Sequence, residues 1–111
     1  MSDEPDQGAF RPPRFEVTAS EDPETGGTLL RVGGELDLVS EPQLNDALDN
    51  AAGRPIRIDL SELTFMDSTG LRALLGAARA HEQLTLGGEL QPAVRRLLEL
   101  TQTLEILPFR G

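Results

Sequence analysis

The sequence has 111 residues, enough for one domain, and its 38% apolar and 26% charged residues are typical of a folded globular protein. Ten basic and nineteen acidic residues give a net charge of −9, which argues against binding to nucleic acids or to anionic membrane surfaces. The absence of cysteine excludes disulfides and thiol chemistry, and a single histidine, His81, leaves few groups for a metal site.

The first thirteen residues differ in composition from the rest of the chain. They contain three acidic residues and three prolines and show no apolar periodicity, which is typical of a flexible acidic N-terminal arm. They lack the basic and apolar regions of a secretory signal, and no apolar run in the chain approaches the ~20 residues that span a bilayer. We therefore expect a cytoplasmic protein with an arm over residues 1–13 and one domain over residues 14–111.

Two strands are expected at the start of this domain. Apolar and polar side chains alternate in residues 14–20 and again in residues 28–36. Residues 21–27 between them contain an Asp-Pro pair and a Gly-Gly pair, which favour a turn. The two strands are therefore expected to form a hairpin.

A helix is expected over residues 40–53. Ser40 and Gln43 have the spacing of a capping box at its start, and Gly53 is a favoured helix terminator. Residues that recur at helical spacing predict one buried stripe, formed by Leu44, Ala47, Leu48 and Ala51.

A third strand and a second helix should follow. Residues 55–63 alternate again and predict a strand that meets a polar break at Ser61 and Glu62. Beyond this break an apolar stripe at helical spacing predicts a helix that runs toward His81, with Leu71, Leu74, Leu75 and Ala78 on its buried side.

The last elements are shorter. Residues 83–90 predict a brief strand, and Pro92 suits the first turn of a third helix, where no N–H group is needed. The apolar run of residues 104–109 predicts a short edge strand that Pro108 stops. Strands that alternate with helices imply crossover connections and helices packed on a mixed sheet.

The stretch TFMDSTGL, residues 64–71, places Ser68 where the third strand gives way to the second helix. Asp67, Ser68 and Thr69 are all favoured helix caps, so capping is the simplest interpretation. A catalytic serine is disfavoured because G-x-S-x-G is absent and His81 lies roughly 19 Å away along the helix. The third alternative is that another protein phosphorylates Ser68.

Phosphorylation of Ser68 is compatible with a helix start. The free N–H groups of the first turn and the positive end of the helix dipole accommodate a phosphate without unfolding the helix. The phosphate adds about −1.5 to −2 charges beside Asp67. A charge pair ~5 Å apart at an effective dielectric constant of about 20 interacts by roughly 3 kcal/mol, which corresponds to on the order of a hundredfold in affinity.

The remaining polar residues have simpler interpretations. Asp59 has no accompanying ligand cluster and is expected to face solvent rather than bind a metal. His81 should make a favourable dipole contact at a helix end, and Arg95 and Arg96 should lie on a solvated helix face. Asp37 either begins a turn or takes part in the site. We expect no catalytic residue, no metal site and no cofactor.

Three segments, LTFMDSTGL at residues 63–71, GGELDL at residues 33–38 and PAVRRLLELT at residues 92–101, together resemble the STAS-domain anti-sigma factor antagonists of bacteria. The likeness runs from about Phe15 to Phe109. It implies the STAS fold, an α/β domain with a mixed β-sheet of four to five strands and helices packed largely on one side.

The resemblance also implies a non-enzymatic switch. In such proteins the serine after the aspartate, here Ser68, is phosphorylated by an anti-sigma factor that is also an ATP-dependent serine kinase. The unphosphorylated antagonist binds this kinase, which releases its sigma factor, and a metal-dependent serine/threonine phosphatase resets the cycle. Gly70 would let the backbone of the partner approach closely. The implied partner-binding residues are Asp37, Asp67, Ser68, Thr69 and Gly70.

Two other expectations accompany the resemblance. An accessory subunit of a lipid transporter, or a scaffold in a sensory assembly, would keep the STAS fold without the kinase cycle. Many relatives continue into a final helix, whereas this sequence ends soon after Phe109. We therefore expect a weak homodimer or a bound partner to cover the face near Leu104 and Ile106.

Overall fold

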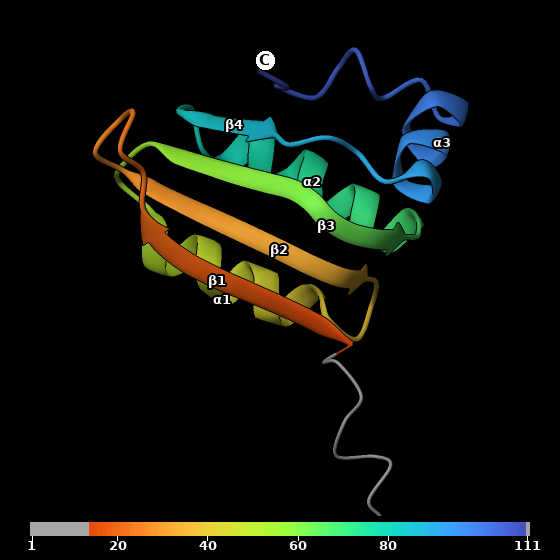
Figure 1. Ribbon diagram of the computed structural model, residues 1–111, viewed down its shortest axis with the longest axis horizontal. Helices are drawn as coiled ribbons and strands as arrows, with labels where there is room; N and C mark the ends of the chain where they lie inside the picture. Colours follow the sequence, from red (N-terminus) through yellow and green to blue (C-terminus); the bar gives the residue numbers. More distant parts are fainter. Residues whose placement is uncertain (1–13, 111) are drawn as a thin grey trace, which may run out of the picture.

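The computed structural model describes residues 14–110, so the predicted N-terminal arm lies outside the described residues. Four strands form one mixed sheet in the order β1-β2-β3-β4 (Figure 1). β1 (Phe15–Glu21) pairs antiparallel with β2 (Thr28–Leu36). β2 pairs in parallel with β3 (Ile56–Met66), and β3 pairs in parallel with β4 (Leu84–Gly87). The predicted first hairpin is confirmed.

Three helices accompany this sheet. α1 (Glu41–Ala51) and α2 (Ser68–Ala80) lie behind the sheet in Figure 1, on the same face. α3 (Pro92–Leu100) contacts the part of β3 that extends beyond β4. The predicted class, a mixed α/β sheet of four to five strands with helices largely on one side, is confirmed with four strands. Within residues 14–110, no helix has the length and apolarity that crossing a bilayer requires.

The core lies between the sheet and the two helices on its covered face. Alternate side chains of the central strands are fully buried, as are the leucines that α1 and α2 direct at them, namely Leu30, Val32, Ile58, Leu60, Leu44 and Leu74. Burial of one such side chain stabilises the fold by about 1.5–3 kcal/mol. Side chains alternate between the two faces of a sheet, so burial of one face fixes the strand register. In this register the carboxyl ends of β2 and β3 lie side by side.

β3 is longer than the sequence predicts. Ser61 and Glu62 do not end the strand, which continues to Met66. The pairing between β2 and β3 instead shifts register on both sides of the Gly33–Gly34 pair. Such a bulge absorbs the extra residues of one strand and leaves the ladder intact beyond it. The polar break is therefore a bulge, and its consequence is that β3 reaches the edge at which α2 begins.

The predicted edge strand at residues 104–109 is reduced to a single parallel bridge between Leu86 and Phe109. The first part of the run forms a turn instead, in which the N–H groups of Ile106 and Leu107 donate to the Thr103 carbonyl. Around the bridge, the Leu86 N–H donates to the Pro108 carbonyl (3.0 Å) and the Arg110 N–H donates to the Leu86 carbonyl (2.9 Å). The outer edge of β4 is thus covered over a short length.

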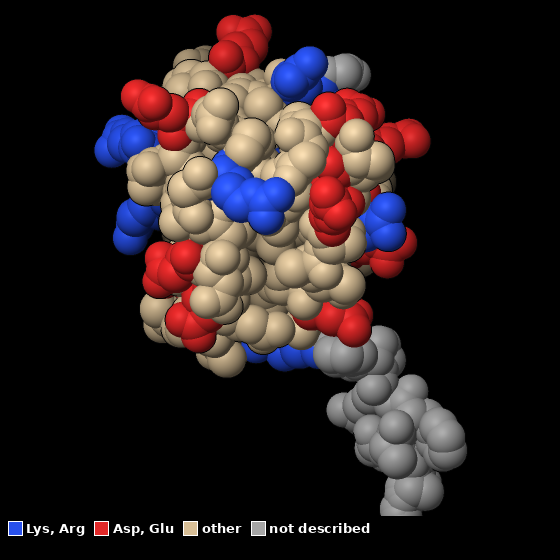
Figure 2. Space-filling model, turned by 90° about the vertical axis from the view of Figure 1, so that its left-hand side faces the viewer, with Lys and Arg blue, Asp and Glu red and all other residues tan. Residues whose placement is uncertain are grey.

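The two ends of the sheet hold different parts of the chain. The hairpin between β1 and β2 and the C-terminal ends of α1 and α2 lie at one end, on the left in Figure 1. Figure 2 shows that basic and acidic side chains are interspersed on this end. The opposite end, where β2 and β3 finish and α2 starts, contains Asp37, Asp67 and Ser68.

Candidate functional site

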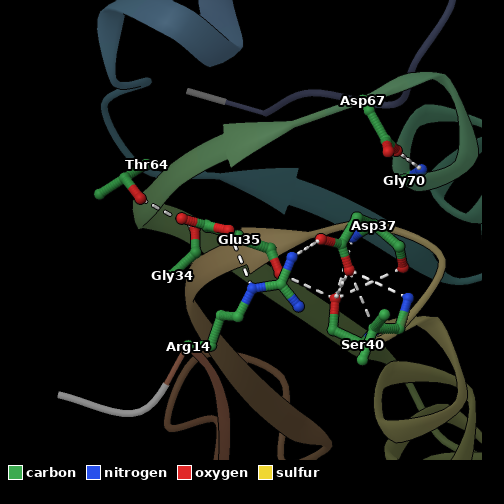
Figure 3. A network of polar contacts seen from close by, with 9 residues as sticks. Arg14, Gly34, Glu35, Asp37, Ser40, Thr64, Asp67 and Gly70 are labelled. Carbon is green, nitrogen blue, oxygen red and sulfur yellow. Dashed lines mark hydrogen bonds and ion pairs between the residues drawn. The ribbon is translucent and has the colours of Figure 1, made fainter. Parts of the chain in front are cut away.

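The candidate site lies where two neighbouring parallel strands end. Leu36 at the end of β2 is the register partner of Met66 at the end of β3. The Asp67 N–H donates to the Leu36 carbonyl (3.3 Å) and joins the two segments as they leave the sheet. Asp37 and Asp67 therefore follow adjacent strands at one edge (Figure 3).

Asp67 is the N-cap of α2. Its backbone is extended, with φ −107° and ψ −169°, and its Oδ1 accepts a hydrogen bond from the Gly70 N–H (3.0 Å). Capping of this kind stabilises a helix by about 1 kcal/mol. The sequence left three residues as capping candidates, and the structure assigns the role to Asp67. Ser68 is the first residue of the helix and is exposed, while Thr69 is half-buried.

Gly70 is buried at the point where α2 passes the end of β2. A Cβ atom at this position would lie 2.3 Å from the Leu36 carbonyl oxygen and 2.8 Å from Cγ of Met66. The residue is therefore glycine because of packing within the chain. This intrachain constraint stands beside the expected close approach of a partner's backbone, which stays a prediction.

The loop that follows β2 is ordered by Asp37 and Ser40 (Figure 3). Asp37 Oδ1 accepts hydrogen bonds from the N–H groups of Val39 (3.1 Å) and Ser40 (3.1 Å). In return, Oγ of Ser40 accepts from the Asp37 N–H (2.9 Å) and donates to the Glu35 carbonyl (2.8 Å). The loop closes on itself before α1 begins.

The predicted capping box of Ser40 and Gln43 does not form. Ser40 occupies the N-cap position of α1, but its side chain makes no hydrogen bond to the helix, and its φ of −92° and ψ of −12° are already helical. The physical reason is competition for the hydroxyl, since the buried Oγ of Ser40 is engaged with Glu35 and Asp37.

A third segment reaches this loop from the start of β1. The Arg14 guanidinium donates to Oδ2 of Asp37 and lies 3.2 Å from Oε1 of Glu35. Burial raises the pKa of Asp37, but the hydrogen bonds from Ser40 and the charge of Arg14 outweigh burial, so that this pKa lies below its usual value. The Asp37 side chain is only 11% exposed and is satisfied within its own chain.

Sequence reasoning placed Asp37 in the site but missed Arg14, Ser40 and the two residues between Asp37 and Ser40. Those two, Leu38 and Val39, are strongly exposed. The signal in the sequence is the pair of aliphatic residues directly after an aspartate that ends a strand. No local signal identifies Arg14, because it lies 23 residues before Asp37.

Other polar residues singled out from the sequence lie away from this edge. His81 follows the last turn of α2, at the opposite end of that helix. Asp59 accepts from the Ser61 N–H (2.9 Å), and Arg95 lies 3.6 Å from a carboxylate oxygen of Glu99. In the part of the chain that the structure describes, no group of three or more His, Asp or Glu side chains is placed to hold a metal ion.

Comparisons with known proteins agree with this architecture. The family model described as "Mlab, STAS domain" matches residues 20–108. An anti-sigma-B factor antagonist of Listeria monocytogenes is 36% identical over 87 residues, which cover 72% of this chain and 75% of that protein. An anti-sigma F factor antagonist of Paenibacillus polymyxa is 34% identical over 93 residues, which cover 76% of this chain and 78% of that protein.

A solved structure shows the same arrangement of elements. The crystal structure of an anti-sigma factor antagonist from Mycobacterium paratuberculosis matches with a TM-score of 0.74 and 26% identity. The match covers 87% of this chain and 86% of that one. With the family match over nearly the whole described chain, the conclusion is that this protein belongs to the STAS domain family.

Proposed function

We propose that this protein is an anti-sigma factor antagonist. Its unphosphorylated form binds an anti-sigma factor that is also an ATP-dependent serine kinase, and the sigma factor is thereby freed. Phosphorylation of Ser68 abolishes this binding, and a serine/threonine phosphatase restores it. The observation that carries the proposal is the exposed Ser68 at the first position of α2, in a chain similar to anti-sigma factor antagonists.

The geometry at the start of α2 suits transfer of a phosphoryl group to Ser68. Because Asp67 caps the helix, the Ser68 hydroxyl is not needed for that role. The N–H groups of the first turn have no acceptor within the helix, and those that the Asp67 cap does not use can stabilise a phosphate. The modification therefore changes the surface and leaves the fold intact. The protein acts as a substrate and a ligand, not as an enzyme, and we place this cycle in the cytoplasm.

The predicted partner-binding residues contribute in two ways. Asp67, Ser68 and Thr69 contribute surface at the start of α2. Asp37 and Gly70 act from within, Asp37 by ordering its loop and Gly70 by setting α2 against β2. A phosphate would add about −1.5 to −2 charges beside Asp67, on a protein whose net charge is already −9.

A direct experiment mixes the purified protein with a candidate anti-sigma factor kinase and ATP. We expect mass spectrometry to find one phosphate on the wild type, mapped to Ser68, and none on Ser68→Ala. Ser68→Ala should still bind the kinase, whereas Ser68→Asp should bind poorly. Thr69→Ala is the matched control and should accept a phosphate. Modification mapped to Thr69, or equal binding by all variants, would contradict the proposal.

A further inference from the structure

Exposed apolar side chains gather at the same edge as Ser68. Among residues 14–110, five large apolar side chains are exposed. Three of them follow β2 or end β3, namely Leu38 (70% exposed), Val39 (74%) and Phe65 (45%). The other two, Leu100 and Ile106, lie at and beyond the end of α3. Scattered apolar side chains are normal on a protein surface, but a group beside a functional site indicates an interaction surface.

The loop that presents Leu38 and Val39 is joined to the start of α2. Leu36 precedes this loop, and its carbonyl accepts the Asp67 N–H, so the loop leaves the sheet beside the residue that precedes Ser68. The loop that carries the two aliphatic side chains and the start of α2 that carries Ser68 therefore lie at the same edge of the sheet. A partner that contacts Ser68 also meets this loop.

The loop is held in place before any partner arrives. Its N–H groups bind the Asp37 carboxylate, and the Ser40 hydroxyl bridges the loop to the Glu35 carbonyl. Arg14, the residue before β1, fixes the same carboxylate. A preordered loop binds without the entropic cost of ordering, so its two aliphatic side chains can contribute their full burial.

The charge around the loop selects the kind of partner. Glu41 follows Val39 by two residues, Asp67 begins the neighbouring segment at this edge, and the protein carries a net charge of −9. A symmetric pair of copies joined here would oppose its own acidic residues. An apolar pocket on a different protein avoids this opposition.

We propose that Leu38 and Val39 are the apolar anchor by which the unphosphorylated protein docks into an apolar pocket of the anti-sigma factor. Phosphate on Ser68 then ends docking because a dianion would lose its water against this anchor, and unpaired charges are strongly disfavoured in such surroundings. This inference rests on the proposed function. The desolvation mechanism differs from simple charge repulsion in its response to salt. At 1 M salt the screening length is only ~3 Å, so repulsion between charges farther apart is largely removed, whereas the cost of desolvating the phosphate remains.

The test measures affinity for the kinase that phosphorylates Ser68, by calorimetry, with the full chain. The double variant Leu38→Ser/Val39→Ser should bind on the order of a hundredfold more weakly than the wild type. The matched control, Leu100→Ser/Ile106→Ser, changes the other exposed pair and should bind as the wild type does. Circular dichroism should show that both variants are folded, since all four residues are exposed.

A second arm uses the phosphorylated protein. Its binding should stay lost when NaCl is raised from 0.1 M to 1 M. Recovery of binding in 1 M NaCl would overturn the desolvation mechanism, and wild-type affinity of Leu38→Ser/Val39→Ser would overturn the anchor. If sedimentation showed that the double variant lost self-association while its affinity for the kinase was unchanged, the proposal that Leu38 and Val39 anchor the protein to the anti-sigma factor would also be overturned. If no anti-sigma factor kinase modifies Ser68 or binds Ser68→Ala, the proposed function and this inference fail together.

Discussion

At Gly70 the first turn of α2 lies so close to β2 that only a hydrogen atom fits between the helix and the Leu36 carbonyl. Two residues earlier, Ser68 faces solvent. Asp67, between the strand and the helix, uses its carboxylate to cap α2. A stretch of four residues thus combines one packing constraint, one cap and one free hydroxyl. These roles can be measured separately, because packing and capping act on the stability of the fold, whereas the free hydroxyl acts on partner binding.

Gly70→Ala should destabilise the protein. The added Cβ would lie 2.3 Å from a backbone oxygen, so the start of α2 must move, at a cost of about 1–3 kcal/mol in the free energy of unfolding. Urea denaturation measures this cost. Gly76→Ala is the matched control on the same helix, since a Cβ there meets nothing within 4 Å, and it should stabilise by up to about 1 kcal/mol. Equal stability of the two variants would contradict the packing argument.

Asp67→Ala should lower the free energy of unfolding by about 1 kcal/mol because the Gly70 N–H loses its acceptor. Asp67→Asn should lose less, since an asparagine oxygen caps about as well. Thermal unfolding of the two variants side by side checks the prediction. If both lost the same stability, the negative charge of Asp67, rather than its capping hydrogen bond, would be the stabilising feature.

At the scale of elements, a buried carboxylate anchors the chain at each end of β2. Asp37 orders the loop into α1, and Asp22 orders the hairpin from β1 through the Glu24 N–H (3.0 Å), the Thr25 hydroxyl and Arg57 (3.0 Å). The hydrogen bond from Glu24, opposed by burial and supported by Thr25 and Arg57, lowers the pKa of Asp22. Both connections of β2 therefore depend on ionised carboxylates.

These two carboxylates predict a loss of stability in acid. A group whose pKa is lower in the folded state stabilises the fold above its unfolded pKa of about 3.9, and this contribution is lost as the pH falls through the folded pKa. Asp37→Asn should therefore be less stable than the wild type at pH 7, and the gap should narrow as the pH approaches 3. Urea denaturation across this range tests it. Asp46→Asn, at an exposed position on α1, is the control. Its free energy of unfolding should change with pH in the same way as that of the wild type.

At the scale of the whole molecule, a second apolar surface remains beyond the site. Leu100 and Ile106 are exposed at the end of α3 and in the following turn, whereas Leu104 is half-buried. The main chain near Phe109 already covers part of the β4 edge. What is left for a second copy is a small patch on an acidic protein, so any association should be weak and should strengthen with salt as repulsion is screened.

Sedimentation at high protein concentration should accordingly detect a weak homodimer, more populated in 0.5 M NaCl than in 0.05 M NaCl. Ile106→Glu should abolish it by placing a charge in the patch. A monomer at every concentration would remove the prediction. Leu38→Ser/Val39→Ser is the control and should leave the dimer unchanged.

Local patterns were sufficient for most of the fold. The order of strands and helices follows from whether apolar residues recur every two or every three to four residues, and Ser68 stands at a strand-to-helix boundary for the same reason. The predictions were wrong where contacts with another segment prevailed over the local pattern. Ser40 has capping spacing but gives its hydroxyl to Glu35 and Asp37, and Ser61 begins a bulge because β2 keeps pairing beyond it.

The sequence by itself therefore determined the α/β class and the position of Ser68 at a helix start, because both depend on contacts within one segment or its neighbour. Only the tertiary structure decided that Arg14 pairs with Asp37, that Gly70 lies against Leu36 and that Leu38 is exposed. The Arg14–Asp37 pair arises from the antiparallel pairing of β1 with β2, and the contact of Gly70 with Leu36 arises from the parallel pairing of β2 with β3. Both contacts join residues more than 20 positions apart, and the periodicity of a single segment carries no information about such partners.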